Sequence, residues 1–190
     1  AITWRAHDIR SDFTDIEPHD LVTLAYVLDE LGPPERARVV ERLWSLARGA
    51  MVIVEPGTTS GWLRILDART QLIAAGANIL APCPHAQACP VMQPDWCHFS
   101  ARLARSRVHR LAKEAEVPWE DEKFIYLVAA RAGSPALAAR VLDRPEAGSG
   151  RVRLKLCTPD GSLAHRLVTR REGEAFRQAR RRDWGDLFEV

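Results

Sequence analysis

The sequence predicts an α/β protein built on one mostly parallel, doubly wound sheet. Continuous apolar runs of strand length occur at residues 21–28, 50–55 and 123–131. Segments with the apolar spacing of an amphipathic helix follow the first two runs. Strands buried on both faces produce such runs, and strands that alternate with helices favour a parallel sheet.

The N-terminal quarter is expected to supply two strands and one helix. Residues 2–9 are predicted to form a strand that ends near an acidic side chain, and residues 21–28 a strand buried on both faces. Gly32-Pro33-Pro34 then breaks the chain. The prolines suit the first turn of a helix that is expected to run to about Arg48.

The middle of the chain continues this alternation. Gly49 is expected to end the first helix, and residues 50–55 to form a second buried strand. An amphipathic helix is predicted over residues 62–75, after a tight turn. Residues 101–116 contain a helix or a strand whose register the pattern does not fix. A further buried strand is expected at residues 123–131.

The C-terminal part is predicted to be a small β-rich module. Residues 134–150 are rich in Ala, Pro and Gly, which is typical of a linker. Polar and apolar residues alternate over 151–157, and a turn sequence at 158–161 is followed by a return strand at 163–169. A helix is expected over residues 172–183.

The two predicted units, residues 1–133 with a cysteine-rich loop at 82–100 and residues 151–190, differ in charge. Residues 1–60 carry ten acidic side chains and six arginines, a net charge of −4, whereas residues 151–182 carry ten Arg or Lys and three acids, a net charge of +7. The basic module suggests a polyanionic partner. No run of about 18 apolar residues and no secretory signal pattern occurs, so a membrane partner is not expected.

The segment CPHAQACPVMQPDWCHFS, residues 83–100, has the most unusual composition. The four cysteines of the chain follow the spacing Cys83-x5-Cys89-x7-Cys97-x59-Cys157. Loops dense in Cys, His and Pro usually fold around something other than their own apolar side chains. Clustered cysteines without secretory features favour ligation over disulfides. We therefore predict that the four cysteines bind an iron–sulfur cluster or a metal.

The spacing favours a [4Fe–4S] cluster. Zinc fingers and ribbons typically begin with two cysteines two to four residues apart, and this chain lacks such a pair. Four thiolates from a long loop and one distant element can surround a cubane cluster, and Cys-Pro is a feature of cluster-binding loops. Two alternatives stay open at this point: zinc, with His85 or His98 as a further ligand, and buried cysteines that hold nothing.

Two pairs of neighbouring residues are candidates for contacts with a nucleotide cofactor: Asp8 with Ile9, and Ala25 with Tyr26. They lie where doubly wound folds bind such ligands, at the carboxyl ends of strands. The alternative is that Asp8 caps a helix or a turn and Tyr26 lies in the core. No Gly-x-Gly-x-x-Gly loop occurs, and no Ser/His/Asp set or carboxylate pair stands out, so no catalytic residue is assigned.

Cationic side chains of the C-terminal module are candidates for RNA phosphate contacts without base specificity. They are Arg151, Arg153 and Lys155 in the alternating strand and Arg177, Arg180, Arg181 and Arg182 in the helix. Trp184 is a candidate for stacking on a base. The alternative is a basic helix face that only contacts solvent.

Three segments together resemble a known family. They are the cysteine loop, the strand KFIYLVAAR, and RLKLCTPDG followed by EAFRQARRRDWGD. These segments are similar to the methyltransferase-like proteins of small-ribosomal-subunit assembly, a family with mitochondrial and bacterial members. The resemblance covers about residues 20–186, and the cysteine loop is its most specific part.

The resemblance implies a class I methyltransferase (Rossmann-like) fold and a [4Fe–4S] cluster on Cys83, Cys89, Cys97 and Cys157. It also implies rRNA or ribosomal proteins of the small subunit as partners, in the cytoplasm of a bacterium or the mitochondrial matrix of a eukaryote. In that fold S-adenosylmethionine binds after the first two strands. This sheet is expected to lack those strands, with Asp8 at the adenine-side acidic position.

The function expected from these observations is that of an rRNA-binding assembly factor on a methyltransferase scaffold, with a structural cluster that docks the basic module on the sheet. Two alternatives of other classes are an active S-adenosylmethionine-dependent RNA methyltransferase and a zinc-bound interaction module.

Overall fold

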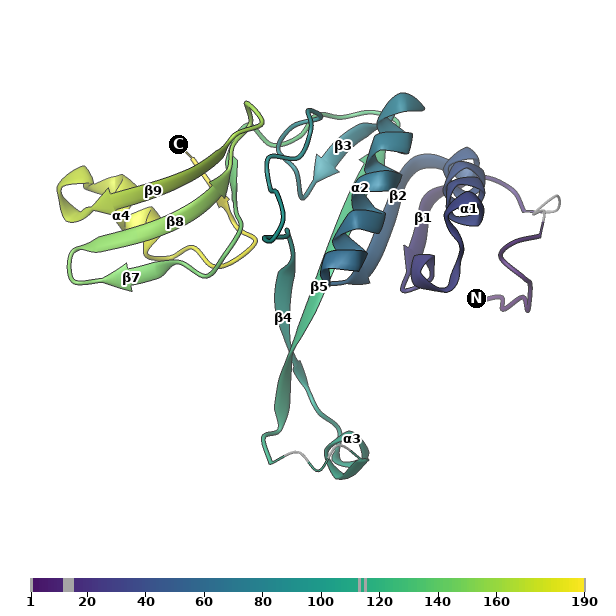
Figure 1. Cartoon of the computed structure of the whole chain (residues 1–190), viewed down its shortest axis with the longest axis horizontal. Coiled ribbons are helices and arrows are strands. Elements are labelled where there is room, and N and C mark those ends of the chain that lie inside the picture. The colour runs from purple at the N-terminus through teal and green to yellow at the C-terminus, as the bar shows by residue number, and fades with distance from the viewer. Residues whose placement is uncertain (1, 12–15, 113, 115, 190) are drawn as a thin grey trace.

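The computed structural model describes residues 2–11, 16–112, 114 and 116–189, and these residues form two sheets that lie side by side (Figure 1). The strands of the first sheet are, in spatial order, β1 (His19–Ala25), β2 (Ala47–Pro56), β5 (Trp119–Ala130) and β3 (Asn78–Ala81), with β4 (Phe99–Ala104) also paired to β5. Those of the second sheet are β10 (Leu187–Phe188), β6 (Ala139–Val141), β8 (Arg151–Cys157) and β7 (Glu146–Gly148), with β9 (Leu163–Thr169) also paired to β8. The predicted α/β class is confirmed.

The first sheet is mixed, so the prediction of a mostly parallel sheet is wrong. Strand β1 runs parallel to β2, but β5 is antiparallel to β2, β3 and β4. The apolar run over 123–131 correctly indicated a strand with a buried face, since Leu127 and Ala129 are fully buried, whereas Tyr126 and Val128 on the opposite face are half-buried. Burial carries no information on direction, and β5 pairs with β4 as a hairpin that fixes the antiparallel arrangement.

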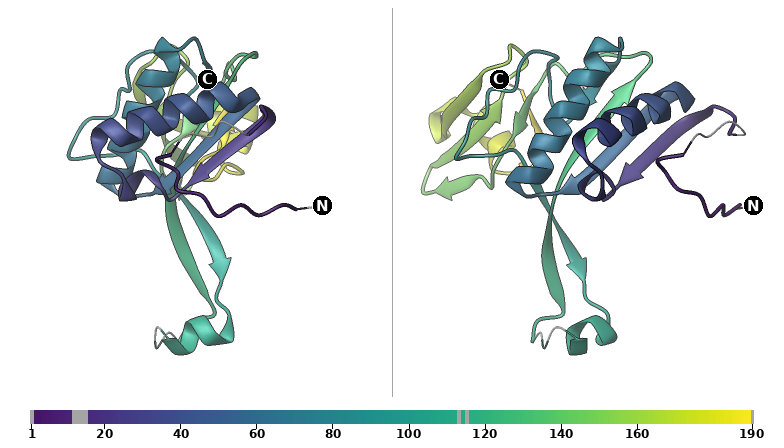
Figure 2. Two further views of the ribbon diagram at one scale, coloured as in Figure 1. Left: turned by 90° about the vertical axis from the view of Figure 1, so that its right-hand side faces the viewer. Right: turned by 45° about the vertical axis from the view of Figure 1, so that its right-hand side comes forward.

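Helices α1 (Pro33–Leu46) and α2 (Thr59–Ala74) pack on one face of the first sheet (Figure 2). Their buried residues, such as Val40 and Ile65, contact the inward side chains Met51 and Ile53 of β2. The Thr58 hydroxyl accepts a hydrogen bond from the Gly61 backbone N–H at 3.0 Å, which caps α2. Both helices thus agree with their predicted positions, but the doubly wound arrangement is not seen within the described part of the chain.

Two predicted strands at the start of the chain are wrong. Residues 2–7 are exposed and belong to no ladder, and an unpaired extended segment does not form a strand. The apolar run over 21–28 is not one buried strand. Its first part lies at the sheet edge, where Leu21 is 56% exposed, and its end continues into a short 3-10 helix, η1 (Leu28–Glu30), where Leu28 is buried.

Gly49 does not end the first helix but lies inside β2. A Cβ atom on Gly49 would lie only 2.5 Å from the backbone oxygen of Asp20, because β1 pairs with β2 here and its register shifts between His19 and Leu21. The glycine therefore permits the approach of two backbones rather than a helix stop.

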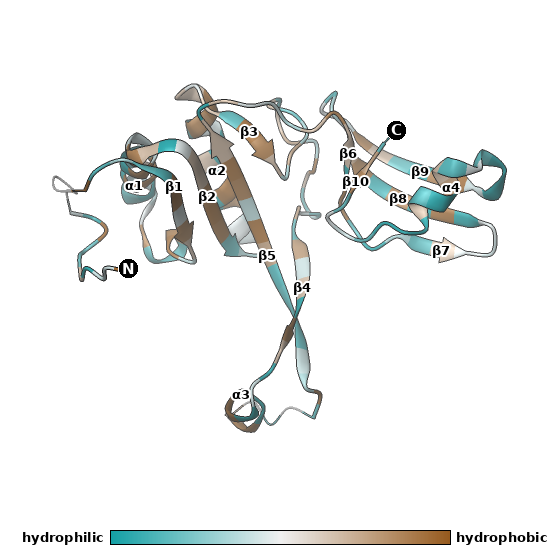
Figure 3. Cartoon of the chain, turned by 180° about the vertical axis from the view of Figure 1, so that it is seen from behind, coloured by the Kyte–Doolittle hydropathy of each residue, from teal (hydrophilic) through white to brown (hydrophobic). Residues whose placement is uncertain are grey.

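A two-stranded arm extends away from both sheets (Figures 1 and 2). It consists of β4, the first residues of β5 and the short helix α3 (Arg107–Ala112) near its end. Along β5 the hydropathy changes from apolar inside the sheet to polar in the arm (Figure 3). Residues 101–116, whose register was left open, therefore contain both a strand end and a helix.

The second sheet has its own small core. Val152, Leu154 and Leu156 of β8 face Val168 of β9 and Phe176 of α4 (Glu174–Ala179). Predicted strands 151–157 and 163–169 are confirmed residue for residue. The predicted helix over 172–183 is shorter, since a 3-10 turn, η2 (Arg170–Glu172), precedes α4.

Residues 134–150, predicted as a linker, contain β6 and β7, which both pair with β8. Three-residue strands of this kind leave no clear hydrophobic period in a sequence. Among the helices described, none combines the length and apolar character needed to cross a membrane.

Candidate metal centre

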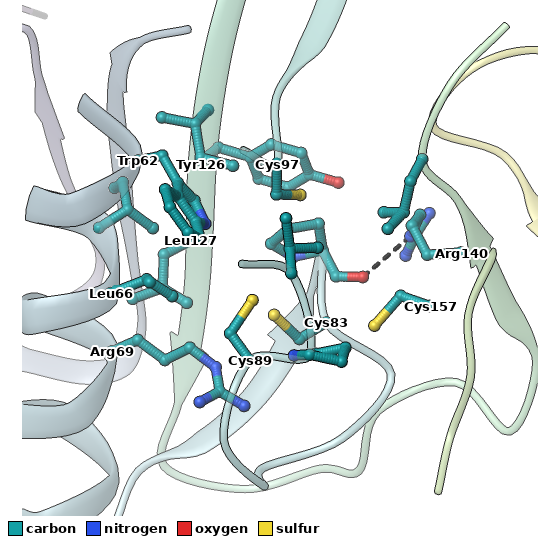
Figure 4. A pocket seen from close by; sticks show the side chains of 16 residues that line it. Trp62, Leu66, Arg69, Cys83, Cys89, Cys97, Tyr126, Leu127, Arg140 and Cys157 are labelled. Carbon is teal, nitrogen blue, oxygen red and sulfur yellow. Dashed lines mark hydrogen bonds between the residues drawn. The ribbon is translucent and has the colours of Figure 1, made fainter. Parts of the chain in front are cut away.

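The structure brings the four cysteines together around one cavity at the junction of the two sheets (Figure 4). Cys83, Cys89 and Cys97 lie in the loop between β3 and β4, whereas Cys157 is the last residue of β8 in the second sheet. The cavity has a volume of about 30 Å³. Side chains of α2, β5, β6 and the cysteine loop complete its lining; they are Trp62, Ile65, Leu66, Arg69, Pro82, Pro90, Val91, Ile125, Tyr126, Leu127, Arg140 and Leu142.

Three hydrogen bonds join the cysteine loop to segments outside it. Arg69 of α2 donates to the carbonyl oxygen of His85 at 2.8 Å, and Arg140 of β6 donates to that of Pro82 at 2.9 Å. The indole Nε1 of Trp96 donates to the carbonyl of Gly57 at 3.0 Å. The loop therefore has a defined path although it contains no helix or strand.

Contacts from the loop also reach the second sheet. Asp95 forms an ion pair with Lys155 of β8. The ring of His98 stacks on Trp96 with 5.0 Å between centroids, and it meets the ring of Trp184 edge-on at 4.7 Å. These contacts place Cys157 opposite the three loop cysteines.

The environment of the cavity disfavours free thiolates. Burial raises the pKa of Cys83, raises the pKa of Cys97 well above its usual range, and raises the pKa of Cys157 to about 12. Neighbouring cysteines act in the same direction, while Arg69 and Arg140 oppose the shift at Cys83 and Cys157. The thiols of Cys83, Cys97 and Cys157 therefore stay protonated at neutral pH unless a bound cation displaces their protons.

Two buried N–H groups at the cavity have no acceptor, and a buried histidine nitrogen nearby has no partner. The Nε of Arg69 and the Nε1 of Trp62 are buried without a hydrogen-bond partner, and both residues line the cavity. His85 is 4% exposed, with Nε2 at 3.3 Å from the Cys157 sulfur and an unpartnered Nδ1. Buried donors of this kind are costly, so a group that offers acceptors would fit between them.

Zinc and a cluster make different demands on the sulfur positions. Within the described ranges, no three His, Cys, Asp or Glu side chains lie in an arrangement that would hold a metal ion. A zinc ion with Zn–S bonds of about 2.3 Å needs sulfurs about 3.8 Å apart. A cluster separates its thiolates more widely, because its iron and sulfide atoms lie between them. Of the two histidines considered as zinc ligands, His85 contacts Cys157, whereas His98 packs between tryptophans.

The predicted nucleotide-contact residues lie elsewhere. Asp8 is in a turn and accepts from both side chain and backbone of Arg10, and the side-chain bonds lower the pKa of Asp8 to about 2. This matches the turn-cap alternative. Ile9 packs against the main core, and Ala25 ends β1. Tyr26 follows with a positive φ of 57° and is 48% exposed. No hydrogen bond or ion pair connects Asp8 with Tyr26 over the residues that the structure describes.

The predicted RNA-contact residues fall on two opposite sides of the second sheet. Arg151, Arg153 and Lys155 alternate with the core residues of β8 and therefore lie on the side away from α4. The four arginines at 177 and 180–182 are in or just after α4. One continuous basic surface is not formed.

The two sets also differ in their contacts. On the β8 side, Arg153 pairs with Glu146 at 3.0 Å, and Arg151 and Arg153 line a groove of about 200 Å³ with Leu167. On the other side, Arg177 pairs with Glu174, and the guanidinium of Arg180 lies 6.0 Å from the ring of Phe176.

Arg69 and Arg140 were not identified as site residues from the sequence. A signal for Arg69 exists, because it lies four residues after Ile65 and three before Leu72, within the buried stripe of α2. A cationic side chain within an apolar helical stripe indicates a buried charge that has a structural or functional role. Arg140 lies in a three-residue strand without a readable pattern, so no comparable signal marks it.

Comparisons with known proteins cover nearly the whole chain. The protein-family profile described as "Mitochondrial small ribosomal subunit Rsm22" matches residues 1–189. The human protein "Ribosome assembly protein METTL17, mitochondrial" is 35% identical over 191 residues, which cover 90% of this chain and 40% of the human protein. Two fission yeast proteins, "Rsm22-cox11 tandem protein 1, mitochondrial" and "Rsm22-cox11 tandem protein 2, mitochondrial", are 29% identical over 77% of this chain and 26% of their own length.

The chain thus spans less than half the length of these curated relatives. The family profile, in contrast, matches it from one end to the other. The resemblance seen in the sequence is therefore confirmed, and the chain belongs to the Rsm22 family of small-ribosomal-subunit proteins.

Proposed function

We propose that this chain takes part in assembly of the small ribosomal subunit, that it binds rRNA, and that its four cysteines hold a structural [4Fe–4S] cluster. The observation that carries the proposal is the convergence of cysteines from both sheets on one cavity, in a chain of a small-ribosomal-subunit family. All three relatives are mitochondrial by name, which supports the mitochondrial matrix for a eukaryotic chain.

The residues at the cavity suit such a cluster. Cys83, Cys89, Cys97 and Cys157 would be its ligands, and Arg69 and Trp62 offer N–H groups of the kind that bond cluster sulfurs. When bound, the cluster supplies iron–thiolate bonds that crosslink the loop to β8. A redox reaction is not needed for this role.

A crosslink at this place would hold the two sheets in a fixed relation. Cys157 is the one proposed ligand that comes from the second sheet. Lys155, two residues before it on the same strand, pairs with Asp95 of the loop. Because metal binding and folding are coupled in such sites, the orientation of the second sheet would depend on the cluster.

The face of β8 opposite α4 is the better candidate for rRNA contacts. It presents Arg151 and Arg153 together with the exposed apolar side chain of Leu167 along one groove. Cationic and apolar groups on an open sheet suit phosphates and unstacked bases. Arginines after α4 are candidates for a second, weaker contact.

Methyl transfer is a second candidate activity. It is favoured by Tyr26, whose positive φ places an exposed aromatic residue at the carboxyl end of a parallel strand. Calorimetric titration of the full-length protein with S-adenosylmethionine tests this activity, and an absence of binding heat would exclude it.

The cluster is tested by anaerobic absorption spectroscopy with iron, sulfide and zinc quantified in the same sample. The expected result is a broad band near 400 nm with about four irons per chain, the mark of a [4Fe–4S] centre. One zinc per chain and no colour would replace the cluster by a zinc-bound interaction module. Neither metal in a protein purified and reconstituted without oxygen would refute the site.

A further inference from the structure

Arg69 is a buried cation at the cysteine cavity without a carboxylate partner. It is 4% exposed, and its side chain extends from α2 toward the loop cysteines (Figure 4). One terminal nitrogen donates to the His85 carbonyl at 2.8 Å, while Nε is buried without any acceptor. Within the residues that the structure describes, no ion pair neutralises its charge.

Arg64, on the same helix, is a buried arginine whose charge is paired with carboxylates. Arg64 is 7% exposed, and its Nε lies 2.8 Å from a carboxylate oxygen of the fully buried Glu55. A second carboxylate, that of Asp29, lies 2.6 Å from Nη1 of Arg64. A buried charge is far less costly when paired in this way than when isolated. The anion that would do the same for Arg69 is therefore not a carboxylate of the described chain.

Arg140 places a second guanidinium group on the other side of the cavity (Figure 4). It donates to the carbonyl of Pro82 at 2.9 Å and to that of Gly185 at 2.7 Å, and neither acceptor carries a net charge. Both arginines are thus fixed in position by backbone oxygens. Between them lie four cysteine sulfurs, which are neutral as thiols and anionic as ligands.

We propose that Arg69 and Arg140 are the counter-cations of the thiolate-bound cofactor, with Nε of Arg69 as a hydrogen-bond donor to it. This inference rests on the proposed cluster site and adds the residues that balance its charge. A cluster on four thiolates carries net negative charge, so it would compensate both guanidinium groups. The empty protein, by contrast, contains a buried cation that nothing balances, and Arg69 would destabilise it.

The test compares the empty and the anaerobically loaded protein by thermal unfolding, and measures the midpoint potential of the loaded form. Arg69→Met removes the charge at similar length. We expect the Tm of the empty form to stay unchanged or rise, and that of the loaded form to fall by roughly 4 °C or more. The potential should shift to more negative values, because a nearby cation favours the reduced cluster.

Two further variants separate charge from packing. Arg69→Lys keeps the cation and should retain most of the wild-type potential. Arg64→Met, the matched control, leaves Glu55 unpaired and should lower the Tm of both forms by the same amount without moving the potential.

Equal losses of Tm in the empty and loaded forms of Arg69→Met, with an unchanged potential, would overturn the counter-cation role and leave the cluster proposal intact. A wild-type protein that binds neither iron nor zinc would overturn both. If the wild type binds zinc, the comparison of the Tm values of the empty and loaded forms is the only test of the counter-cation role.

Discussion

Replacement of Cys157 by serine isolates the link between the two sheets. Cys157 is the ligand from β8, it is 6% exposed, and its sulfur lies 3.3 Å from Nε2 of His85. A serine hydroxyl is similar in size and can also bond to His85. In the empty protein the change should therefore cost only about 1 kcal/mol, a shift in Tm of roughly 2–4 °C.

The loaded protein should lose much more. Structural metal sites with four ligands contribute about 10–16 kcal/mol, so one ligand accounts for about 3 kcal/mol. For a chain of this size that corresponds to a fall in Tm of roughly 6–12 °C. Differential scanning calorimetry of empty and loaded samples, wild type and Cys157→Ser, measures both numbers.

Limited proteolysis provides an independent readout of the same variant. The segment that joins β5 to β6 contains Leu137, which is 93% exposed. If the second sheet is released, cleavage after Leu137 should become faster in loaded Cys157→Ser than in the loaded wild type. Equal losses of Tm in the loaded and empty forms, with equal cleavage rates, would refute the crosslink.

Three other predictions address the core, the RNA face and the arm. Glu55→Gln should lower the free energy of unfolding in urea by about 3 kcal/mol, because it leaves the buried Arg64 with one carboxylate. Arg151→Glu should weaken rRNA-fragment binding and reduce the salt slope by about 1, whereas Arg177→Glu on the opposite side should change both less. Asp121, whose partner arginines lower its pKa to about 2, should keep its ion pairs above about pH 4 and lose them as the pH falls through 2. Carboxyl NMR titration measures that pKa.

Each of these three has a clear contrary result. A loss below about 1 kcal/mol for Glu55→Gln would mean that Asp29 alone satisfies the arginine. Equal effects of the two charge reversals would assign the RNA contact to net charge rather than to the β8 face. Titration of Asp121 near its usual value of 3.8 would show that the ion pairs of the arm do not form in solution.

The sequence predicted the parts of this fold that have a strong local period. The alternation over 151–157 and the turn sequence after it located β8 and β9 correctly, since one face of that hairpin is buried and the other exposed. Helix α2 was found for the same reason. Strand direction was not predictable, because the antiparallel position of β5 follows from its pairing with β4 and not from its composition.

At the candidate site, the sequence indicated the candidate cysteine ligands but not the side chains that surround them. Cys83 to Cys97 stood out by composition, and Cys157 was included as the fourth cysteine of the chain and through the family resemblance. The structure places it beside the others through contacts such as that of Lys155 with Asp95, which involve distant segments. Arg140 became visible only when β6 was placed at the cavity, since a charge next to a site has no sequence period.

The peptide of Gly57 connects the base of the arm with the cysteine loop. Its N–H donates to the carbonyl of Lys123, and its own carbonyl accepts from Trp96, the neighbour of Cys97. A Cβ atom at Gly57 would lie 2.7 Å from the backbone of Lys123, so any larger residue would push these two segments apart.

Lys123 is also the last residue of the arm at which β5 pairs with β4 alone, since the pairing with β2 begins at Phe124. We therefore expect any bending of the arm to concentrate near this residue, where the Gly57 peptide also contacts the cysteine loop. A displacement of the arm would therefore be passed to the cysteine loop through the Gly57 peptide, which is bonded to both segments.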